Sequence, residues 1–193
     1  MDKITQKILK QLQTKNLIKK DDLEIYSFGL ECLFLKIIHI LSYLLIGLCM
    51  KELLSLLISG SVLIPLRRKA GGYHAKTRSG CYVFSCCVVF LLCLTNKTTA
   101  IPLIIYGELL ITDILILLFA PVENENRKLN LDEQNLFRKQ AIKLLFIVNA
   151  IIIAICLLDN YLFLAHWSKN GIIFAGGLLL MGIKKDKFKT PAA

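Results

Sequence analysis

Residues 32–50, CLFLKIIHILSYLLIGLCM, decide the fold of this chain. An apolar run of this length is close to the roughly 20 residues that a helix needs to cross a bilayer. Five further apolar runs follow, at about 53–66, 80–95, 100–120, 141–158 and 171–183. Because backbone polar groups inside a bilayer must be satisfied within their own segment, each run predicts a helix. The sequence therefore predicts an all-α, polytopic membrane protein with about six transmembrane helices.

The composition of the 193 residues agrees with this class, since 55% of them are hydrophobic and the net charge is +10. A hydrophobic fraction this high exceeds that of ordinary globular chains. The lysines and arginines lie in blocks between the apolar runs, where they would face anionic head groups or set the topology. We therefore expect anionic membrane lipid, and not nucleic acid, to be the partner of this positive charge.

Four basic blocks predict the topology: the N-terminal segment, the connections 67–79 and 121–143, and the tail from residue 184. Lysine and arginine concentrate in cytoplasmic loops. Six crossings place all four blocks on one side of the membrane. The alternative is four crossings with the short second and sixth runs folded back, but it would put the 67–79 block outside. We expect six crossings, with both termini in the cytoplasm.

The N-terminal segment combines lysines with apolar residues at helical spacing, namely Ile4, Ile8, Leu9 and Leu12. This pattern predicts a basic amphipathic helix over residues 1–20 that lies on the membrane surface. A solvated cytoplasmic helix without lipid contact is the alternative. We divide the chain accordingly into an N-terminal amphipathic segment, 1–30, and a transmembrane domain, 31–193.

Residues 67–81, RRKAGGYHAKTRSGC, are the stretch in which catalytic residue types gather. His74 and Cys81 are a candidate base and nucleophile of the kind that cysteine hydrolases use. On a straight helix, seven positions would separate them by about 10 Å along the axis, whereas a base must come within about 3 Å of its nucleophile. The hypothesis therefore requires a break in the helix. Three glycines permit one: Gly71, Gly72 and Gly80.

Cys81 would lie in the first turn of the third membrane helix, where the helix dipole favours a thiolate, and Arg78 would add to this effect. A backbone N–H near Gly80 would be suited to stabilising an oxyanion. From spacing alone, an interfacial histidine and a packing cysteine remain the alternative. We expect no cofactor and no metal, because these residues lack the paired short spacings of a structural zinc site.

Two carboxylates interrupt the fourth apolar run, Glu108 and Asp113. Ionisable groups inside a bilayer are costly and are functional by default. One of them would orient His74. The alternatives are that each is a partner for a basic residue of another helix or, for Glu108, that it lies near a water-filled face. Together with Lys36 in the first run, they also support an alternative function, a small transporter of a peptide or a cation.

The motif Gly71-Gly72-Tyr73-His74, then six residues and Cys81, with Arg67-Arg68 before it, resembles the signature of the accessory gene regulator B family, the AgrB peptidases. The chain length, the amphipathic N-terminal segment and the several spans are similar to that family too. So is Ala120-Pro121-Val122 followed by Arg127-Lys128. The resemblance covers essentially the whole chain.

The resemblance implies a bacterial membrane cysteine endopeptidase that cleaves an AgrD-like propeptide on the cytoplasmic side. Cys81 would form a thioester acyl-enzyme, with His74 as base and acid. A thiol or hydroxyl within the substrate would then capture the acyl group, giving a thiolactone or lactone. An acidic propeptide tail would be attracted to the basic block. We assign substrate binding to Arg67, Arg68, Lys69, Gly71, Gly72 and Arg78.

Three glycines in the last apolar run bear on oligomeric state: Gly176, Gly177 and Gly182. Small residues let membrane helices approach closely. The approach would be either within one chain or between two copies, so a homodimer and a monomer both agree with the sequence.

Overall fold

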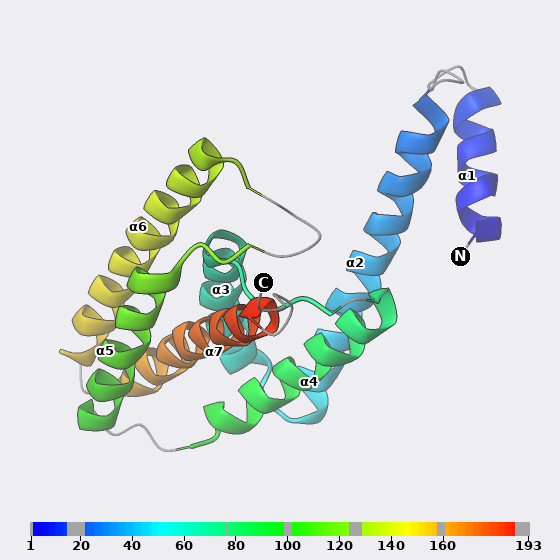
Figure 1. Cartoon of the computed structure of the whole chain (residues 1–193). Helices are drawn as coiled ribbons and strands as arrows, with labels where there is room; N and C mark the ends of the chain where they lie inside the picture. Colours follow the sequence, from blue (N-terminus) through cyan, green and yellow to red (C-terminus); the bar gives the residue numbers. More distant parts are fainter. Residues whose placement is uncertain are drawn as a thin grey trace. The chain divides into compact units, whose positions relative to one another are not determined.

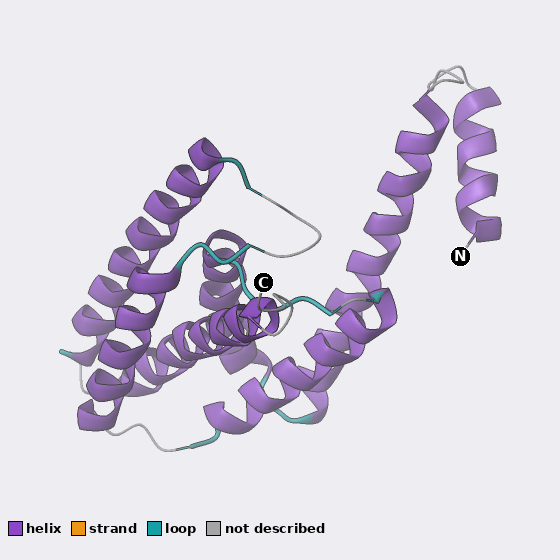
Figure 2. Ribbon diagram, in the orientation of Figure 1, coloured by secondary structure: helices purple, strands orange, loops and turns teal. Residues whose placement is uncertain are grey.

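The computed structural model describes residues 2–14, 22–75, 77–98, 102–123, 129–157 and 161–187. These residues form seven α-helices, which Figure 1 labels in chain order: α1 (Asp2–Thr14), α2 (Leu23–Cys49), α3 (Leu53–Ala70), α4 (Arg78–Asn96), α5 (Pro102–Phe119), α6 (Leu131–Cys156) and α7 (Leu162–Lys187). Figure 2 shows helices joined by loops, without a strand in the described part of the chain. The predicted all-α fold class is confirmed, and each apolar run falls on a helix.

The chain divides into two compact units, residues 1–45 and 46–193. The first unit contains α1 and most of α2. Helix α1 buries Thr5 and Leu9, while Lys7 and Lys10 are exposed. The N-terminal segment is therefore an amphipathic helix in its described part, and residues 1 and 15–20 of that prediction lie outside the described residues.

Helix α2 is apolar and strongly exposed. The exposed fractions of Ile25, Phe28 and Leu41 are 72%, 61% and 61%. In water, so much exposed apolar surface would mark an aggregation site, whereas a lipid bilayer solvates it favourably. Three helices, α2, α4 and α6, are long and apolar enough to be candidate membrane spans among the described residues. The length and apolar composition of these helices identify the molecule as a multi-pass membrane protein.

Helix α7 forms the centre of the second unit, and α3, α4, α5 and α6 all pack on it. Its residues Ile172, Ala175 and Leu179 are fully buried. An added Cβ at Gly171 would lie 2.9 Å from the Cβ of Val62 in α3. The small residue in α7 therefore lets α3 pack directly against it, and the other helices pack around α7.

A hydrogen-bonded polar cluster joins α3, α4 and α7 near the start of α7. The Asn96 side chain donates to Ser59 Oγ at 3.1 Å and accepts from Asn170 Nδ2 at 2.9 Å. Trp167 Nε1 donates to the Asn96 carbonyl oxygen at 3.2 Å. Since buried polar groups require partners, this cluster fixes the end of α4 that is remote from Cys81.

Candidate active site

The segment between α3 and α4 is not helical. Helix α3 ends at Ala70, and α4 begins at Arg78. Gly71 and Gly72 follow α3 with φ of 78° and 131°, values that favour glycine. The predicted break between His74 and Cys81 is confirmed, with residue 76 outside the described part of the chain.

Gly71 lies against the turn that follows α5. The Val122 N–H donates to the Ala70 carbonyl oxygen at 2.9 Å, and Gly71 and Val122 form an isolated bridge. A Cβ at Gly71 would collide with the Val122 carbonyl oxygen. Glycine is therefore required here by the close approach as well as by the backbone angle.

The backbone of Tyr73 is held on both sides. Its N–H donates to the carbonyl oxygen of Leu178 in α7 at 2.8 Å. Its carbonyl oxygen accepts from Arg67 Nη2 in α3, also at 2.8 Å. Because Tyr73 directly precedes His74, these two bonds fix the point from which the imidazole projects.

The Tyr73 ring packs on α4. It contacts the ring of Phe84, with the ring centroids 4.8 Å apart and the planes inclined at 58°. Phe84 comes three residues after Cys81, and residues three apart share a helix face. The segment that carries His74 thus contacts α4 on the face that also carries Cys81, about one turn further along.

Cys81 lies in the first turn of α4 and is partly exposed. Thr77 caps this helix: its Oγ1 accepts from the Gly80 N–H at 3.0 Å, and its carbonyl oxygen accepts from the Cys81 N–H at 2.9 Å. The thiol is at the positive end of the helix dipole, as predicted. The N–H groups of Gly80 and Cys81 donate to Thr77, so neither bond is directed to a substrate oxygen. The oxyanion role of Gly80 stays a prediction.

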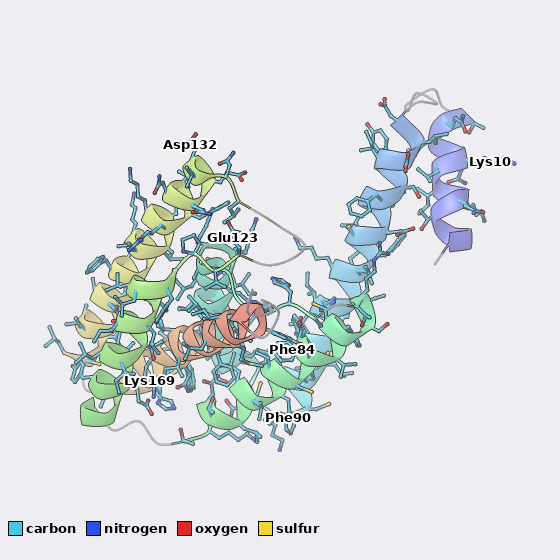
Figure 3. The ribbon with its side chains drawn as sticks, in the orientation of Figure 1. Lys10, Phe84, Phe90, Glu123, Asp132 and Lys169 are labelled. Atoms are coloured by element: carbon cyan, nitrogen blue, oxygen red, sulfur yellow. The ribbon has the colours of Figure 1, made fainter. Side chains whose placement is uncertain are left out.

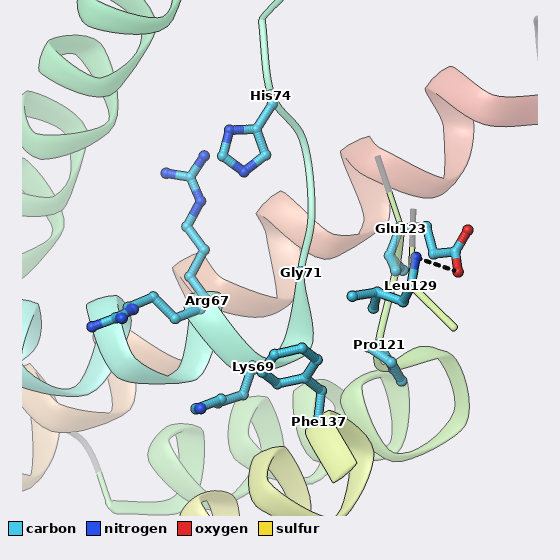
Figure 4. Close-up of a pocket in the computed structure, with 10 residues that line it drawn as sticks. Arg67, Lys69, Gly71, His74, Pro121, Glu123, Leu129 and Phe137 are labelled. Atoms are coloured by element: carbon cyan, nitrogen blue, oxygen red, sulfur yellow. Dashed lines mark hydrogen bonds between the residues drawn. The ribbon is translucent and has the colours of Figure 1, made fainter. Parts of the chain in front are cut away.

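A cavity of about 330 Å³ opens beside His74 (Figure 4). Arg67, Arg68, Lys69 and Gly71 line it together with the imidazole, and Figure 4 shows the Arg67 guanidinium and the His74 ring pointing toward one another. The described lining does not include the other predicted site residues, which are Gly72, Arg78, Gly80, Cys81, Glu108 and Asp113. The structure therefore gathers the basic block around His74, with Cys81 on the adjoining helix.

The opposite wall of this cavity comes from residues that the sequence did not single out as site residues. Phe137 of α6 holds Lys69, whose Nζ lies 5.0 Å from the ring centroid. Glu123 Oε1 accepts from Gln134 Nε2 at 2.6 Å and from the Leu129 N–H at 3.3 Å, the dashed line in Figure 4. Three cations and one carboxylate line the cavity, and this carboxylate is already bonded to Gln134 and Leu129, which makes the cavity suited to an anionic group.

The two carboxylates of α5 pair with other helices. Glu108 forms an ion pair with Lys169 of α7. Asp113 Oδ2 accepts from Asn149 Nδ2 of α6 at 2.7 Å. The Glu108 pair is the predicted contact with a basic residue of another helix, whereas the partner of Asp113 is an amide and not a basic residue. An orienting role toward His74 stays a prediction. Among the described residues, no cluster of three His, Cys, Asp or Glu side chains is arranged to hold a metal ion.

The sequence did not predict the polar cluster at the start of α7. His166 is 4% exposed in that helix, and its Nε2 lies 3.2 Å from the Thr95 carbonyl oxygen. The sequence could have indicated part of this cluster, because His166 and Asn170 are four residues apart and share a helix face.

In a comparison with known protein families, the family model described as AgrB, accessory gene regulator B, matches residues 1–183. No curated protein and no solved structure matches the chain. The matched range includes the whole segment 67–81 and all helices, with α7 matched as far as residue 183.

Proposed function

The chain belongs to the AgrB family, and from that membership we propose that it is a membrane cysteine peptidase in which Cys81 is the nucleophile and His74 the base and acid. Family membership implies a role in processing an AgrD-type propeptide, and hence in quorum sensing. The substrate is accordingly an AgrD-like propeptide, cleaved at the membrane surface.

In the proposed reaction the Cys81 thiolate attacks the scissile carbonyl carbon, and the amide C–N bond breaks. His74 takes the thiol proton and gives it to the departing amine of the C-terminal fragment. A thiol or hydroxyl within the acyl part then attacks the thioester and releases Cys81. The product is a thiolactone or lactone ring. Attack by an internal thiol replaces one thioester by another, so this step conserves bond energy. The site must exclude water, which would otherwise hydrolyse the acyl-enzyme.

The observation that carries this proposal is the contact of Tyr73 with Phe84. It ties the residue before the imidazole to the helix face on which the thiol lies. The bonds from Tyr73 to Leu178 and Arg67 leave that segment little freedom to move away. Holding reacting groups in place in this way is a large part of enzymatic rate enhancement.

The cavity beside His74 supports the assignment of substrate binding to the basic block. Arg67, Arg68, Lys69 and Gly71 line it, with one apolar wall that includes Leu129 and Phe137. An extended propeptide segment with acidic and apolar side chains would match both walls. Gly72 and Arg78 contribute to the site indirectly. Gly72 lets the backbone before His74 lie close to α7, and Arg78 adds positive charge at the start of the helix that carries Cys81.

Six crossings, with both termini and the active site in the cytoplasm, complete the proposal. The ends of α3 and α5 meet, since Val122, after α5, bonds to Ala70 at the end of α3. The C-terminal half of α7 lies beside the segment that follows α3, because the Leu178 carbonyl oxygen accepts from the Tyr73 N–H. Helices α4 and α6 start close to the same connections. Alternating crossings produce this arrangement, and the positive-inside rule assigns the end with Arg67 to Lys69 to the cytoplasm.

The domain division and the partners extend the proposal. Residues 1–30 form the segment at the anionic lipid surface, and residues 31–193 form the transmembrane peptidase. For a homodimer the support is weaker, because added Cβ atoms at Gly176 and Gly182 would meet residues of the same chain.

Reconstitution in liposomes with a small AgrD-type propeptide tests the function. The unaltered protein should release the C-terminal fragment and a cyclic product, both measured by mass. Cys81→Ser and His74→Ala should insert normally and release neither. Cys87→Ser is the matched control, because this exposed thiol lies further along the same helix. Retained processing by Cys81→Ser or His74→Ala would refute the proposal.

A further inference from the structure

We propose that Gly182, in the C-terminal part of α7, is a positioning residue for His74. The inference rests on the proposed function, because it concerns how the segment that carries the imidazole is held. Gly182 is buried, and it faces the Gly72-Tyr73 backbone just before His74. The absence of a side chain at residue 182 lets this backbone lie directly on the helix.

The contact leaves no room for a methyl group. A Cβ added at Gly182 would lie 2.9 Å from the carbonyl carbon of Gly72, 3.0 Å from its Cα and 3.1 Å from the nitrogen of Tyr73. All three neighbours are backbone atoms, so no change of a side-chain rotamer relieves the collision. A residue larger than glycine must displace the His74 segment itself.

The hydrogen bond from Tyr73 depends on the same feature. Its acceptor is the carbonyl oxygen of Leu178, four residues before Gly182. In an α-helix the carbonyl of residue i points toward residue i+4. Without a Cβ at residue 182, this carbonyl stays accessible from outside the helix and accepts a second donor, the Tyr73 N–H. A side chain there would cover the acceptor and push the donor away.

The partner surface has the same property. A Cβ added at Gly72 would lie 2.8 Å from the Leu178 carbonyl oxygen and 3.1 Å from the Leu179 nitrogen. The close approach is thus formed by two facing glycines, one in the motif and one in α7. The sequence motif contains the first. The second is one of the three glycines of the last apolar run, and the structure shows that its close approach is to the motif within the same chain.

Gly177, one and a half turns earlier in α7, is a matched control. It is exposed, and an added Cβ there would meet nothing within 4 Å. Alanine favours the helical conformation over glycine, so helix propensity predicts no harm from either substitution. A difference between Gly177→Ala and Gly182→Ala therefore reports the contact with the His74 segment.

The test uses the full chain in liposomes and measures propeptide processing together with the pH dependence of Cys81 alkylation by iodoacetamide, read from the mass of the Cys81 peptide. Displacing a catalytic group by about 1 Å costs roughly 100-fold in rate, so Gly182→Ala should lower kcat about 10- to 100-fold with little change in KM. Its alkylation profile should move toward that of His74→Ala. Gly177→Ala should match the unaltered protein.

Two results would overturn the inference. One is a Gly182→Ala variant with unaltered kcat and alkylation profile. The other is a double variant, His74→Ala with Gly182→Ala, whose alkylation of Cys81 differs from that of His74→Ala alone, because Gly182 would then act on the thiol by another route. If His74→Ala itself processes normally, the proposed function fails. If only Gly182→Ala is normal, the positioning role alone fails.

Amide hydrogen exchange in the unaltered protein tests the positioning role without any variant. In the unaltered protein the Tyr73 amide should exchange slowly, because it is bonded to Leu178. Exchange of this amide as fast as that of an exposed loop amide would contradict the positioning role, even if Gly182→Ala did not insert into the membrane.

Discussion

Gly71 is constrained twice, by its backbone angles and by its neighbour. Its φ of 78° and ψ of −155° lie in a region that is essentially restricted to glycine. A side chain there would also meet the Val122 carbonyl oxygen. The two constraints act together at the point where α3 ends and the His74 segment begins, so a local change there is transmitted to the imidazole.

Gly71→Ala should therefore destabilise the protein by about 1–3 kcal/mol and abolish most propeptide processing. Gly60→Ala, in the same α3 helix, is its control, since an added Cβ at Gly60 meets nothing within 4 Å. Thermal unfolding in detergent and product mass measure the two effects. Equal behaviour of the two variants would show that the Gly71 contact does not matter.

The motif glycines could be predicted from the sequence as a bend, but their partners could not. The glycines between the two apolar segments favour a break in the helix over a continuous one. Val122 and Leu178, which Gly71 and Gly72 approach, are distant in sequence, and no local pattern connects them. The same limit hid Phe137, because a cavity wall formed by another helix leaves no trace in the spacing of the first.

Helix α4 is held near both of its ends. Near the start, Phe84 contacts Tyr73, and at the far end Asn96 bonds to α3 and α7. Figure 3 shows Phe84 and Phe90 on this helix. Phe90 is 47% exposed, so it is an apolar side chain of the same size and helix without the Tyr73 contact.

Phe84→Ala should lower kcat on the order of 10-fold, because loss of the ring contact loosens the His74 segment relative to Cys81. Phe90→Ala should leave kcat within about twofold, since exposed positions have small effects. Steady-state processing in liposomes measures both. An equal fall in the two variants would indicate a general effect on α4 and not the Tyr73 contact.

Asn96→Leu should lower the unfolding free energy by about 1–3 kcal/mol, because it removes two buried hydrogen bonds, those of the Asn96 side chain with Ser59 Oγ and with Asn170 Nδ2. Asn135→Ala, at an exposed position of α6, is the control and should be neutral. Thermal unfolding of the detergent-solubilised protein distinguishes them. An unchanged midpoint for Asn96→Leu would mean that the cluster does not stabilise the bundle.

Helices were the predictable elements, because hydrophobic runs in a bilayer must satisfy their own backbone. Their ends were less predictable: α2 begins at Leu23, before the predicted run from residue 32, since its first turns contain acidic residues that an apolar count leaves out. Likewise, Asn96 and Asn170 lie just outside the predicted apolar runs, although both are buried. Hydropathy treats polar residues as exposed, and only tertiary contacts reveal that these are bonded to one another.

At the scale of the whole molecule, the basic block and His74 lie at one end of the second unit. The hydrogen-bonded polar cluster of Ser59, Asn96 and Asn170 lies at another. The helices between them present large apolar side chains outward, as a bilayer requires. The proposed six crossings assign these two ends to opposite sides of the membrane.

Cysteines introduced at Lys139 and Lys97, both exposed, test that assignment. An impermeant maleimide should label Lys139→Cys only in inside-out vesicles and Lys97→Cys only in right-side-out vesicles, because Lys139 precedes the apolar part of α6 and Lys97 follows the end of α4. Peptide mass separates the new labels from those on native cysteines. Labelling of both positions from one side would rule out the alternating topology.

Trapping the acyl-enzyme tests the central claim most directly. After the protein is mixed with propeptide and quenched in acid, intact-mass measurement should show a covalent adduct equal to the N-terminal part of the substrate. Peptide mapping should place it on Cys81, and Cys81→Ser should lack it. A cyclic product formed without an adduct on Cys81, or an adduct on another cysteine, would contradict the account.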